Sequence, residues 1–259
     1  MKRVAIFAKE KPLCQDTKEV VLNLLKENGF PIDENNPEVV IVIGGDGTFL
    51  RAVHHYLDND VMFVGLNAGH LGFFSEFELE EINLLPQVLK EEKYDMKSYR
   101  LLNAVISSTN ESKEIYAVNE VRIENPFRSL TADVSINGKH LEKFRGNGLV
   151  VCSAIGSSAY NKSLGGAIVD TSMETLELTE IAAIQNNVYR TISSSYVVNG
   201  ESTITFEGRL NEVVVGFDSE TIHLDQASKV TISLSKKIIK LIDYKHISHV
   251  KKLKDSFIE

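Results

Sequence analysis

The sequence has no apolar run long enough to span a bilayer, and it begins MKRVAIF, without the apolar region and small-residue cleavage site of a secretory signal. A membrane-spanning or secreted protein is therefore disfavoured, and we expect a cytoplasmic location. Cysteine is also scarce. The only two, Cys14 and Cys152, are far apart and match neither a disulfide framework nor a zinc-binding pattern. We expect two free thiols.

Positive charge is in short supply relative to negative charge. With 28 Lys and Arg residues against 36 Asp and Glu residues, the formal net charge is −8. This balance disfavours a nonspecific surface for nucleic acids or anionic membranes. The concentrated basic residues lie late in the chain, at 236–237 and 251–254, where a solvated face is the favoured interpretation. With 43% hydrophobic residues over 259 positions, the chain has the composition of a soluble globular protein with room for two domains.

Short apolar runs alternate with helical stretches over the first 98 residues, as in βαβ units. The pattern predicts strands at 4–8, 39–43 and 61–66, and a helix that begins at residue 16 or 17 and ends near Gly29. The unbroken β-branched run at 39–43 is typical of a strand buried on both faces, as parallel sheets require. We therefore expect an α/β domain over residues 1–98.

From residue 99 the sequence changes to short strand-like runs separated by turn signals, which indicates a β-rich, sandwich-like domain over 99–245. Asn137-Gly138, between two alternating segments, is the strongest hairpin signal in this region. Residues 246–259 form a basic, amphipathic tail. We expect the tail to pack back on the body of the protein as a helix, but no residue indicates on which surface.

The predicted strand 39–43 runs directly into a loop with the sequence GGDGT at residues 44–48. Three glycines within four residues let the backbone approach a bulky anion, and Thr48 is expected to cap a helix that begins at Phe49. Asp46 would repel a phosphate, so it fits this loop only as a ligand of a divalent cation or as a base toward an attacking hydroxyl. The loop therefore predicts phosphoryl transfer. A purely structural strand-to-helix turn is the alternative.

Four later segments carry polar or aromatic groups in loops: NAGHLGFF at 67–74, Asn119-Glu120, FRGNGL at 144–149 and GSSAYNKSLGG at 156–166. An amide beside a carboxylate suits a vicinal diol such as ribose, although the dipeptide taken alone favours a solvent-facing pair at a strand end. The segment at 144–149 is equally consistent with a β-bulge or tight turn. The hydroxyls at 157–163 offer neutral hydrogen bonds to a base or a phosphate, but such clusters are also ordinary loops.

Taken together, the motifs at 44–48, 119–120, 145–148 and 156–160 resemble, in order and spacing, the motif set of the NAD kinases. Segments 69–73 and 186–192 agree as well, so the resemblance spans most of the chain. It implies a Rossmann-like N-terminal domain joined to a β-rich C-terminal domain, with the active site between them. It also implies a homodimer or homotetramer in which one chain completes its neighbour's site.

The chemistry that this resemblance implies is transfer of the ATP γ-phosphoryl group to the 2′-hydroxyl of the adenosine ribose of NAD, with Mg²⁺ accompanying ATP. Asp46 would activate that hydroxyl or hold the metal ion, and Asn119 and Glu120 would orient the ribose and the adenosine. The other implied binding residues are Gly44, Gly45, Gly47 and Thr48 at the phosphates, Phe73 and Phe74 on the adenine, and Arg145, Asn147, Ser158, Ala159, Tyr160, Ser163 and Ala182 around the dinucleotide.

Two positions depart from the family pattern. Asn147 stands where relatives have an aspartate, and Cys152-Ser153-Ala154-Ile155 stands where they have a Ser-Thr-Pro-Thr type of turn. Both departures predict weakened or altered dinucleotide binding, because a charge-assisted hydrogen bond and a rigid polar turn are lost. Two alternatives stay open. One is a related kinase acting on a lipid or sugar, against which the ribose-type contacts weigh; the other is a catalytically weak regulator, against which Asp46 weighs.

Overall fold

The computed structural model describes residues 1–67, 72–108, 111–208, 210, 212–224 and 227–258. The chain forms two compact units: unit 1 holds Met1–Tyr99 and Ile239–Glu259, and unit 2 holds Arg100–Ile238. The sequence pattern assigned residues 239–245 to the second domain. In the structure they belong to unit 1, because the end of the last strand pairs with the sheet of that unit. No helix within the described ranges is long and apolar enough to cross a membrane.

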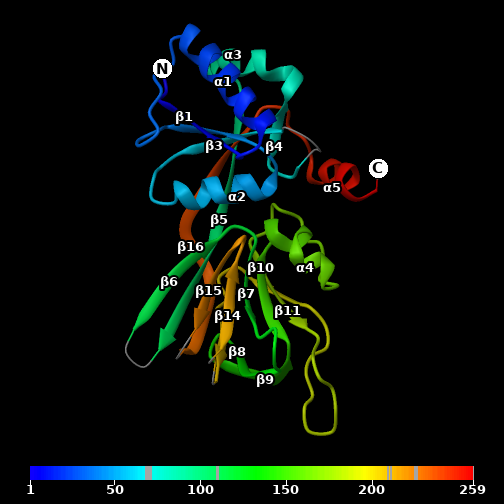
Figure 1. The fold of residues 1–259 in the computed structure, drawn as a ribbon. Coiled ribbons are helices and arrows are strands. Elements are labelled where there is room, and N and C mark those ends of the chain that lie inside the picture. The colour runs from blue at the N-terminus through cyan, green and yellow to red at the C-terminus, as the bar shows by residue number, and fades with distance from the viewer. Residues whose placement is uncertain (68–71, 109–110, 209, 211, 225–226, 259) are drawn as a thin grey trace. The chain divides into compact units, whose positions relative to one another are not determined.

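Unit 1 is an α/β unit built around a parallel sheet (Figure 1). Its elements are β1 (Val4–Ala8), α1 (Pro12–Glu27), β2 (Val39–Ile43), α2 (Asp46–His55), β3 (Met62–Asn67), β4 (Ser75–Glu78), η1 (Leu79–Leu84), α3 (Leu85–Glu91) and α5 (His249–Phe257), with the first residues of β5 (Asp95–Ser108) and the last of β16 (Ala227–Asp243). Strands β1, β2 and β3 are parallel neighbours, and β4 and β16 both pair with β3 in parallel.

The sequence patterns of unit 1 explain most of these elements. The strands predicted at 4–8 and 39–43 are confirmed, and all five residues of β2 are buried, as a central parallel strand requires. Helix α1 begins at Pro12, earlier than predicted, because proline is well tolerated in the first helical turn, where its missing N–H is not needed. Gly29 follows the helix with a φ of +79°, which is the predicted left-handed C-terminal cap.

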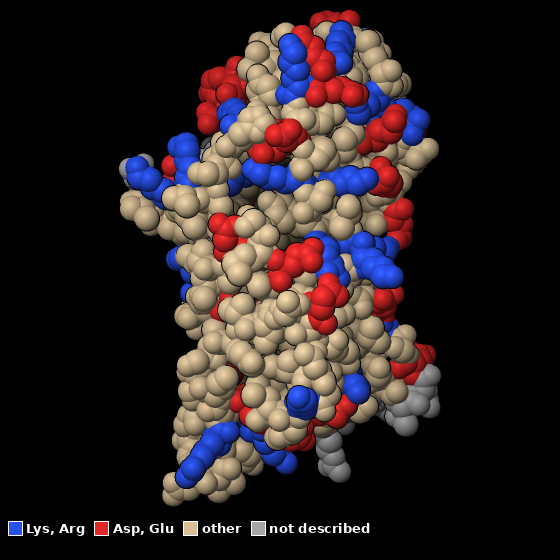
Figure 2. Space-filling view, turned by 180° about the vertical axis from the view of Figure 1, so that it is seen from behind, with Lys and Arg blue, Asp and Glu red and all other residues tan. Residues whose placement is uncertain are grey.

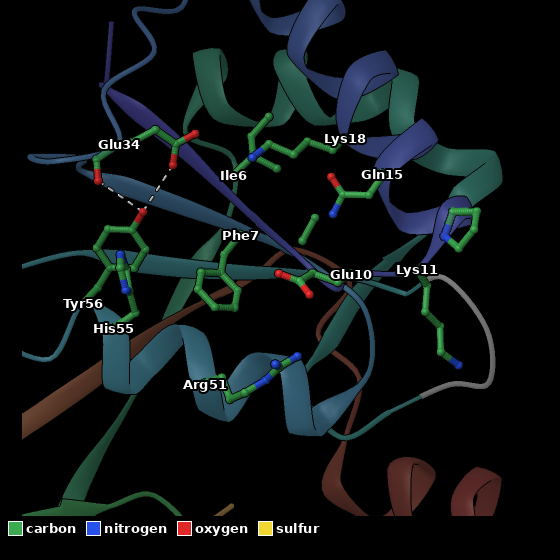
Figure 3. A pocket seen from close by; sticks show the side chains of 12 residues that line it. Ile6, Phe7, Glu10, Lys11, Gln15, Lys18, Glu34, Arg51, His55 and Tyr56 are labelled. Carbon is green, nitrogen blue, oxygen red and sulfur yellow. Dashed lines mark hydrogen bonds between the residues drawn. The ribbon is translucent and has the colours of Figure 1, made fainter. Parts of the chain in front are cut away.

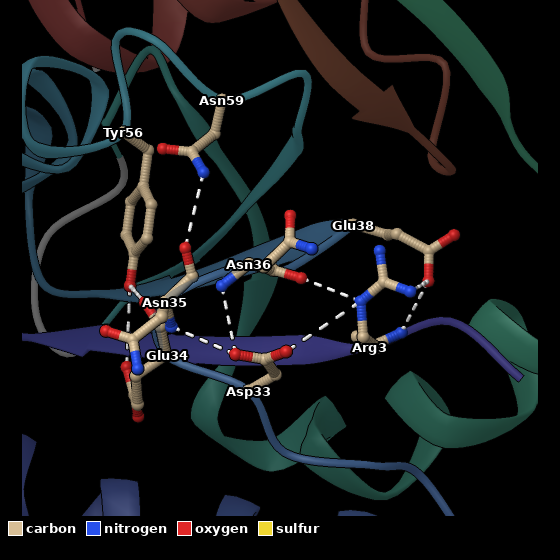
Figure 4. Close-up of polar contacts among 8 residues, drawn as sticks. All are labelled: Arg3, Asp33, Glu34, Asn35, Asn36, Glu38, Tyr56 and Asn59. Carbon is tan, nitrogen blue, oxygen red and sulfur yellow. Dashed lines mark hydrogen bonds and ion pairs between the residues drawn. The ribbon is translucent and has the colours of Figure 1, made fainter.

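The segment that leads into β2 is held in place by polar contacts (Figure 4). Asp33 accepts a hydrogen bond from the Asn36 N–H at 2.9 Å, and the Arg3 Nε donates to the Asn36 carbonyl oxygen at 2.7 Å. The Tyr56 hydroxyl donates to the Glu34 carbonyl oxygen at 3.2 Å. Burial, together with the Glu34 carboxylate, raises the pKa of Tyr56 to about 12, so this hydroxyl keeps the proton that it donates.

Unit 2 is a sandwich of two antiparallel sheets, which confirms the predicted β-rich domain. One sheet has the strand order β12-β11-β10-β7-β14-β15, and the other contains β5, β6, β8, β9, β13 and the first part of β16. The new elements are β6 (Ser112–Ala117), β7 (Glu120–Glu124), β8 (Leu130–Ile136), β9 (Lys139–Gly146), β10 (Gly148–Ser153), η2 (Ile155–Ser158), α4 (Tyr160–Ser163), β11 (Thr175–Ile181), β12 (Tyr196–Asn199), β13 (Ile204–Glu207), β14 (Val213–Phe217) and β15 (Glu220–Leu224). Apolar side chains of both sheets, among them Phe144, Phe206 and Leu149, form one buried core.

Two local predictions for the chain are also confirmed. Strands β8 and β9 form the hairpin expected at Asn137 and Gly138, whose φ angles of +51° and +73° suit the tight turn between twisted strands. Cys14 and Cys152 are both free and buried. On the face drawn in Figure 2, basic side chains are interspersed with acidic ones.

Candidate functional site

The GGDGT motif lies where β2 passes into α2. Gly44 has a φ of +151°, and a Cβ there would lie 2.6 Å from Thr48 Oγ1, so no other residue fits. Helix α2 begins at Asp46, with Gly45 in the N-cap position. The prediction that Thr48 caps a helix starting at Phe49 is therefore wrong. The glycines turn the chain at once, so the helix starts earlier and Thr48, only 3% exposed, packs inside its first turn.

Among the described residues, nothing covers the backbone of this loop at Gly45 and Gly47. A Cβ on either glycine would meet none of their atoms within 4 Å, in contrast to Gly44. A bulky anion can therefore approach the backbone here, next to the first N–H groups of α2, which favour negative charge. The neighbouring loop after β3 contains Gly69, His70 and Leu71 of the predicted motif, and residues 68–71 lie outside the described residues.

The Asp46 carboxylate is held by two backbone donors at the start of α2. The Phe73 N–H donates to Oδ2 at 3.2 Å, and the Phe74 N–H donates to Oδ1 at 3.1 Å. A Cβ on Gly72 would lie 2.5 Å from Oδ1, so only glycine allows this close approach. Both carboxylate oxygens are therefore fixed, and a carboxylate in the first turn is also favoured by the helix dipole.

Phe73 and Phe74 have protein partners within unit 1. Phe74 is 8% exposed and stacks on Phe49, with ring centroids 4.6 Å apart and planes 5° apart. The Phe73 ring lies 5.8 Å from the ring of Phe257 and 6.4 Å from that of His249, both on α5. Their packing on an adenine ring stays a prediction, whereas their backbone N–H groups have an observed role in holding Asp46.

A hollow of about 700 Å³ opens in unit 1 at the carboxyl end of β1 (Figure 3). Its lining includes the cations Lys11, Lys18 and Arg51, the carboxylates Glu10 and Glu34, and His55. The Lys9 N–H donates to the carbonyl oxygen of Ile43 at 3.0 Å, so the mouth of this hollow adjoins the strand end that carries the glycine loop. Ligands of open α/β sheets bind at such carboxyl ends. No motif in the sequence had indicated this space.

Asn119 and Glu120 are buried in unit 2, with exposures of 9% and 5%, so the solvent-facing interpretation of this pair is wrong. Asp218, in the turn after β14, fixes them from behind. Its carboxylate accepts the N–H groups of Val118 at 2.8 Å and Asn119 at 2.7 Å, and its own N–H donates to the Glu120 carbonyl oxygen at 3.1 Å. The backbone of the pair is therefore held in one position.

The surroundings of the Glu120 carboxyl group act on its pKa in opposite directions. Burial and, next in size, the Asp218 charge raise the pKa of Glu120 to about 7, against the lowering effect of Arg122. The Arg122 guanidinium lies 3.6 Å from Oε1. The second oxygen, Oε2, is buried and has no hydrogen-bond partner among the described residues. A buried acceptor without a donor is costly, so this oxygen is suited to receive a hydroxyl from a ligand.

The segment after β10 packs directly on Asn119. A Cβ on Gly156 would lie 2.0 Å from the Asn119 carbonyl oxygen, so glycine is required at this contact. Ser157 and Ser158 are buried beside it, with exposures of 1% and 7%. The Ser157 hydroxyl accepts from the Val169 N–H at 2.9 Å and so serves the fold. The structure thus brings together two segments that the sequence analysis had singled out separately.

Tyr160 is tied to the same group through Glu124 of β7. Its hydroxyl donates to Glu124 Oε1 at 3.3 Å, while Arg122 Nε donates to Glu124 Oε2 at 3.0 Å and the guanidinium lies 5.8 Å from the Tyr160 ring centre. Ala159 is half-buried, and Ser163 is exposed at the end of α4. The aromatic ring is therefore held in a defined orientation at the edge of the group.

A second group of predicted binding residues in unit 2 consists of Arg145, Asn147 and Ala182. The Asn147 N–H donates to the Ile181 carbonyl oxygen at 2.9 Å, and Ala182 follows with a φ of +46°. Arg145 donates to the Ser129 hydroxyl at 3.2 Å and lies 5.1 Å from the Tyr189 ring centre. The side chains of Asn147 and Ala182 are exposed.

This second group lies at the opposite end of β10 from Asn119 and Glu120. Gly148 is paired with Glu124, whereas Cys152 is paired with Glu120. At roughly 3.4 Å per strand residue, the two groups are separated by about 14 Å along the sheet. The structure therefore places Asn119 and Glu120 at one end of β10 and Asn147 at the other, where Glu124 also accepts the Tyr160 hydroxyl.

Three functional-site neighbours had no sequence signal that would have found them. Asp218 and Arg122 support Glu120, and Lys252 of α5 donates to the Phe73 carbonyl oxygen at 2.6 Å. Asp218 and Lys252 reach their partners through tertiary structure, whereas Arg122 lies two positions after Glu120 on β7, and none of the three belongs to a motif. Glu124 was likewise missed, although it lies only four positions after Glu120 on the same strand.

Two family models match this chain. The model for the ATP-NAD kinase N-terminal domain matches residues 7–94, and that for the ATP-NAD kinase C-terminal domain matches residues 118–244. The NAD kinase of Leuconostoc mesenteroides is 33% identical over 259 residues, which cover 99% of this chain and 98% of the relative. The NAD kinase of Streptococcus gordonii is 36% identical over an alignment of 263 positions, which covers 99% of this chain and 96% of the relative.

Two solved structures share the fold. Yeast NADH kinase complexed with NADH superposes with a TM-score of 0.85 at 17% identity, covering 98% of this chain and 86% of that one. An NAD kinase from Archaeoglobus fulgidus in complex with ATP superposes with a TM-score of 0.77 at 20% identity, covering 98% and 99%. Together with the family matches and the close relatives, these findings show that the chain belongs to the NAD kinase family and is a phosphotransferase that phosphorylates NAD with ATP.

Proposed function

We propose that Asp46 is the general base of this reaction. It takes the proton of the 2′-hydroxyl of the adenosine ribose while that oxygen bonds to the γ-phosphorus of ATP and the bond to the bridging β,γ-oxygen breaks. A ribose hydroxyl is a weak nucleophile unless a base accepts its proton. The observation that carries the proposal is the double N–H hold on Asp46 from Phe73 and Phe74. It leaves lone pairs on both carboxylate oxygens for a hydroxyl or a cation.

Asn119 and Glu120 orient NAD in this proposal. The buried Glu120 Oε2 accepts from a ribose hydroxyl, and the Asn119 amide contacts the adenosine. Ser158, Ala159, Tyr160 and Ser163 line the space around the dinucleotide. Holding the acceptor hydroxyl toward ATP accounts for most of what such an enzyme contributes, since phosphoryl transfer depends chiefly on positioning and charge stabilisation.

The donor ATP occupies the open surface over Gly45 and Gly47, with the cations of the neighbouring hollow serving its phosphates. Lys11, Lys18 and Arg51 supply this positive charge. The described residues contain no cluster of three His, Cys, Asp or Glu side chains that could hold a metal ion. Where Mg²⁺ accompanies ATP, Asp46 would be the protein carboxylate that could hold it, and the ion would supply neutralisation of charge on the transferred group.

Arg145, Asn147 and Ala182 complete the site of a second copy in this proposal. They lie about 14 Å along β10 from Asn119 and Glu120, at roughly 3.4 Å per residue. A homodimer or homotetramer would bring one chain's exposed cluster to its neighbour's NAD. The buried free thiols suit a reducing compartment, and we keep the cytoplasm as the location.

The experiment that tests the role of Asp46 compares the wild type with Asp46→Asn in NADP formation from ATP, Mg²⁺ and NAD. Asparagine keeps the shape but cannot accept the proton, so we expect unchanged NAD binding by calorimetry and a loss of turnover of at least a hundredfold, the scale of general base catalysis. Parallel reactions with NADH, polyphosphate, a sugar and a lipid panel test acceptor and donor range. Wild-type turnover in the variant would remove Asp46 from the mechanism.

A further inference from the structure

The C-terminal helix α5 contacts the loop that holds Asp46, within unit 1. Ser248 caps this helix, because its hydroxyl accepts the Lys251 N–H at 3.2 Å. Phe257 brings its ring to 5.8 Å from that of Phe73, and Lys252 Nζ donates to the Phe73 carbonyl oxygen at 2.6 Å. The basic tail, which the sequence left without a docking surface, therefore reaches the backbone next to the proposed base.

Lys252 and Asp46 bind the two ends of one peptide group. The Phe73 carbonyl oxygen, which accepts from the Lys252 ammonium, and the Phe74 N–H, which donates to Asp46 Oδ1 at 3.1 Å, belong to the same peptide unit. An ammonium at the oxygen draws electron density from the N–H and strengthens its bond to the carboxylate, since hydrogen bonds in series polarise one another. The charge order is ammonium, peptide dipole and carboxylate, each favourably aligned with the next.

The surroundings of Lys252 keep this arrangement away from bulk water. Burial lowers the pKa of Lys252, while the carboxylates of Glu76, Asp243 and Asp46 raise it and Lys97 lowers it. Glu76 is itself 6% exposed and accepts the Tyr244 N–H at 2.8 Å. A half-buried ammonium among three carboxylates is fixed more firmly than a surface lysine, because screening by water is weaker there.

We propose that Lys252 is a positioning residue for phosphoryl transfer: it fixes and polarises the Phe73–Phe74 peptide group, so that this group holds the Asp46 carboxylate in its reactive orientation. The inference rests on the proposed function of Asp46 as the base. A lysine that only fastened the tail would affect the stability of unit 1 and would act independently of Asp46. A positioning lysine acts on turnover and acts through Asp46.

The first test compares kcat and KM in Lys252→Met, Lys252→Gln and Lys252→Arg. Methionine keeps most of the apolar stem and removes the charge and the donors, so we expect kcat to fall roughly tenfold, as for loss of one hydrogen bond to a charged group, with little change in the KM for NAD. Arginine retains charge and donors and should restore most of kcat. Lys251→Met is the matched control, since Lys251 lies on the same helix, is 62% exposed and pairs with Asp255; its kcat should equal that of the wild type.

The second test is a double-mutant cycle with Asp46→Asn, measured with radiolabelled ATP. If Lys252 acts through Asp46, the double variant should be little less active than the Asp46→Asn single variant. The same tenfold loss in both backgrounds would overturn the inference, and so would a wild-type kcat in Lys252→Met. Melting temperatures show whether a variant has lost its fold, in which case Lys252→Gln, which keeps an uncharged NH₂ donor group, replaces Lys252→Met in the cycle.

The two proposals fail in different ways in these experiments. Full turnover of Asp46→Asn alone would overturn the role of Asp46 as the base, whatever Lys252 does. A strongly impaired Asp46→Asn together with a fully active Lys252→Met would leave the base in place and overturn only the positioning role of Lys252.

Discussion

Replacing Asp218 with asparagine should change both the stability of unit 2 and the pH range in which NAD binds. Asp218 accepts the N–H groups of Val118 and Asn119 on its two oxygens, at 2.8 Å and 2.7 Å. Asparagine is nearly isosteric but offers one carbonyl oxygen and one NH₂ group, so one buried N–H would face another donor. Loss of one hydrogen bond to a charged group costs about 2 kcal/mol. For a chain of this size that cost corresponds to a fall in Tm of roughly 4–8 °C.

The same substitution should move the acid limb of the activity profile. In the wild type the pKa of Glu120 is raised to about 7, first by burial and then by the Asp218 charge. As the pH falls through that value, Glu120 gains a proton, accepts ribose hydroxyls less well, and kcat/KM for NAD should decline. Removing the negative charge of Asp218 favours ionised Glu120, so its pKa falls and the decline should begin at a lower pH.

The assay is kcat/KM for NAD between pH 5 and 8, alongside thermal melts. Glu120→Gln has no group to titrate and should lose this limb altogether. Ser219→Ala is the matched control, because Ser219 is exposed in the same turn and touches neither N–H donor. An acid limb that stays in place, or moves to higher pH, in a folded Asp218→Asn variant would refute the electrostatic reasoning.

Four further outcomes are expected. The double variant Asn147→Asp, Ala154→Pro, which restores the usual family residues, should lower the KM for NAD several-fold, and an unchanged KM would show that these departures do not limit binding. Lys18→Ala and Arg51→Ala should raise the KM for ATP while the KM for NAD stays constant; an effect on NAD alone would place ATP elsewhere. Gel filtration should give a multiple of the 28.9 kDa chain mass. Co-expression of Asp46→Asn with Arg145→Glu should then restore activity that neither has alone, and a strictly monomeric active enzyme would contradict the shared site.

The sequence predicted those parts of the fold that depend on local patterns. The apolar runs of β1 and β2 and the Asn137-Gly138 turn each carry their own signal, because burial and positive φ angles select residue types directly. The start of α2 was missed for a local reason as well. Capping side chains usually indicate a helix start, but here Gly44 and Gly45 turn the chain and the helix begins at Asp46 without a side-chain cap.

Two supporting residues of the site, Asp218 and Lys252, could not be predicted because they act over long separations in sequence. Asp218 reaches the Asn119 N–H across 99 positions, and Lys252 reaches the Phe73 carbonyl oxygen across 179. No local pattern distinguishes an aspartate in a hairpin turn that supports a buried backbone from one that faces water. The burial of Asn119 and Glu120 likewise depends on β7 lying between β10 and β14, which only the folded sheet reveals.

Because of strand β16, the sheet of unit 1 cannot be completed until the end of the chain has been synthesised. Lys240 and Leu241 pair with Met62 and Phe63 of β3, so this sheet is assembled from two stretches that all of unit 2 separates in the chain. The ribosome releases the N-terminal stretch first. Met62 and Phe63 on the edge of β3 therefore lack their β16 partners until residues 239–259 emerge. During translation this part of β3 is therefore an unpaired strand edge, open to wrong partners. During the same interval, the Phe73–Phe74 peptide group that holds Asp46 also lacks its contact with Lys252. The nascent chain therefore passes through a stage in which it can misassemble and cannot yet work as an enzyme.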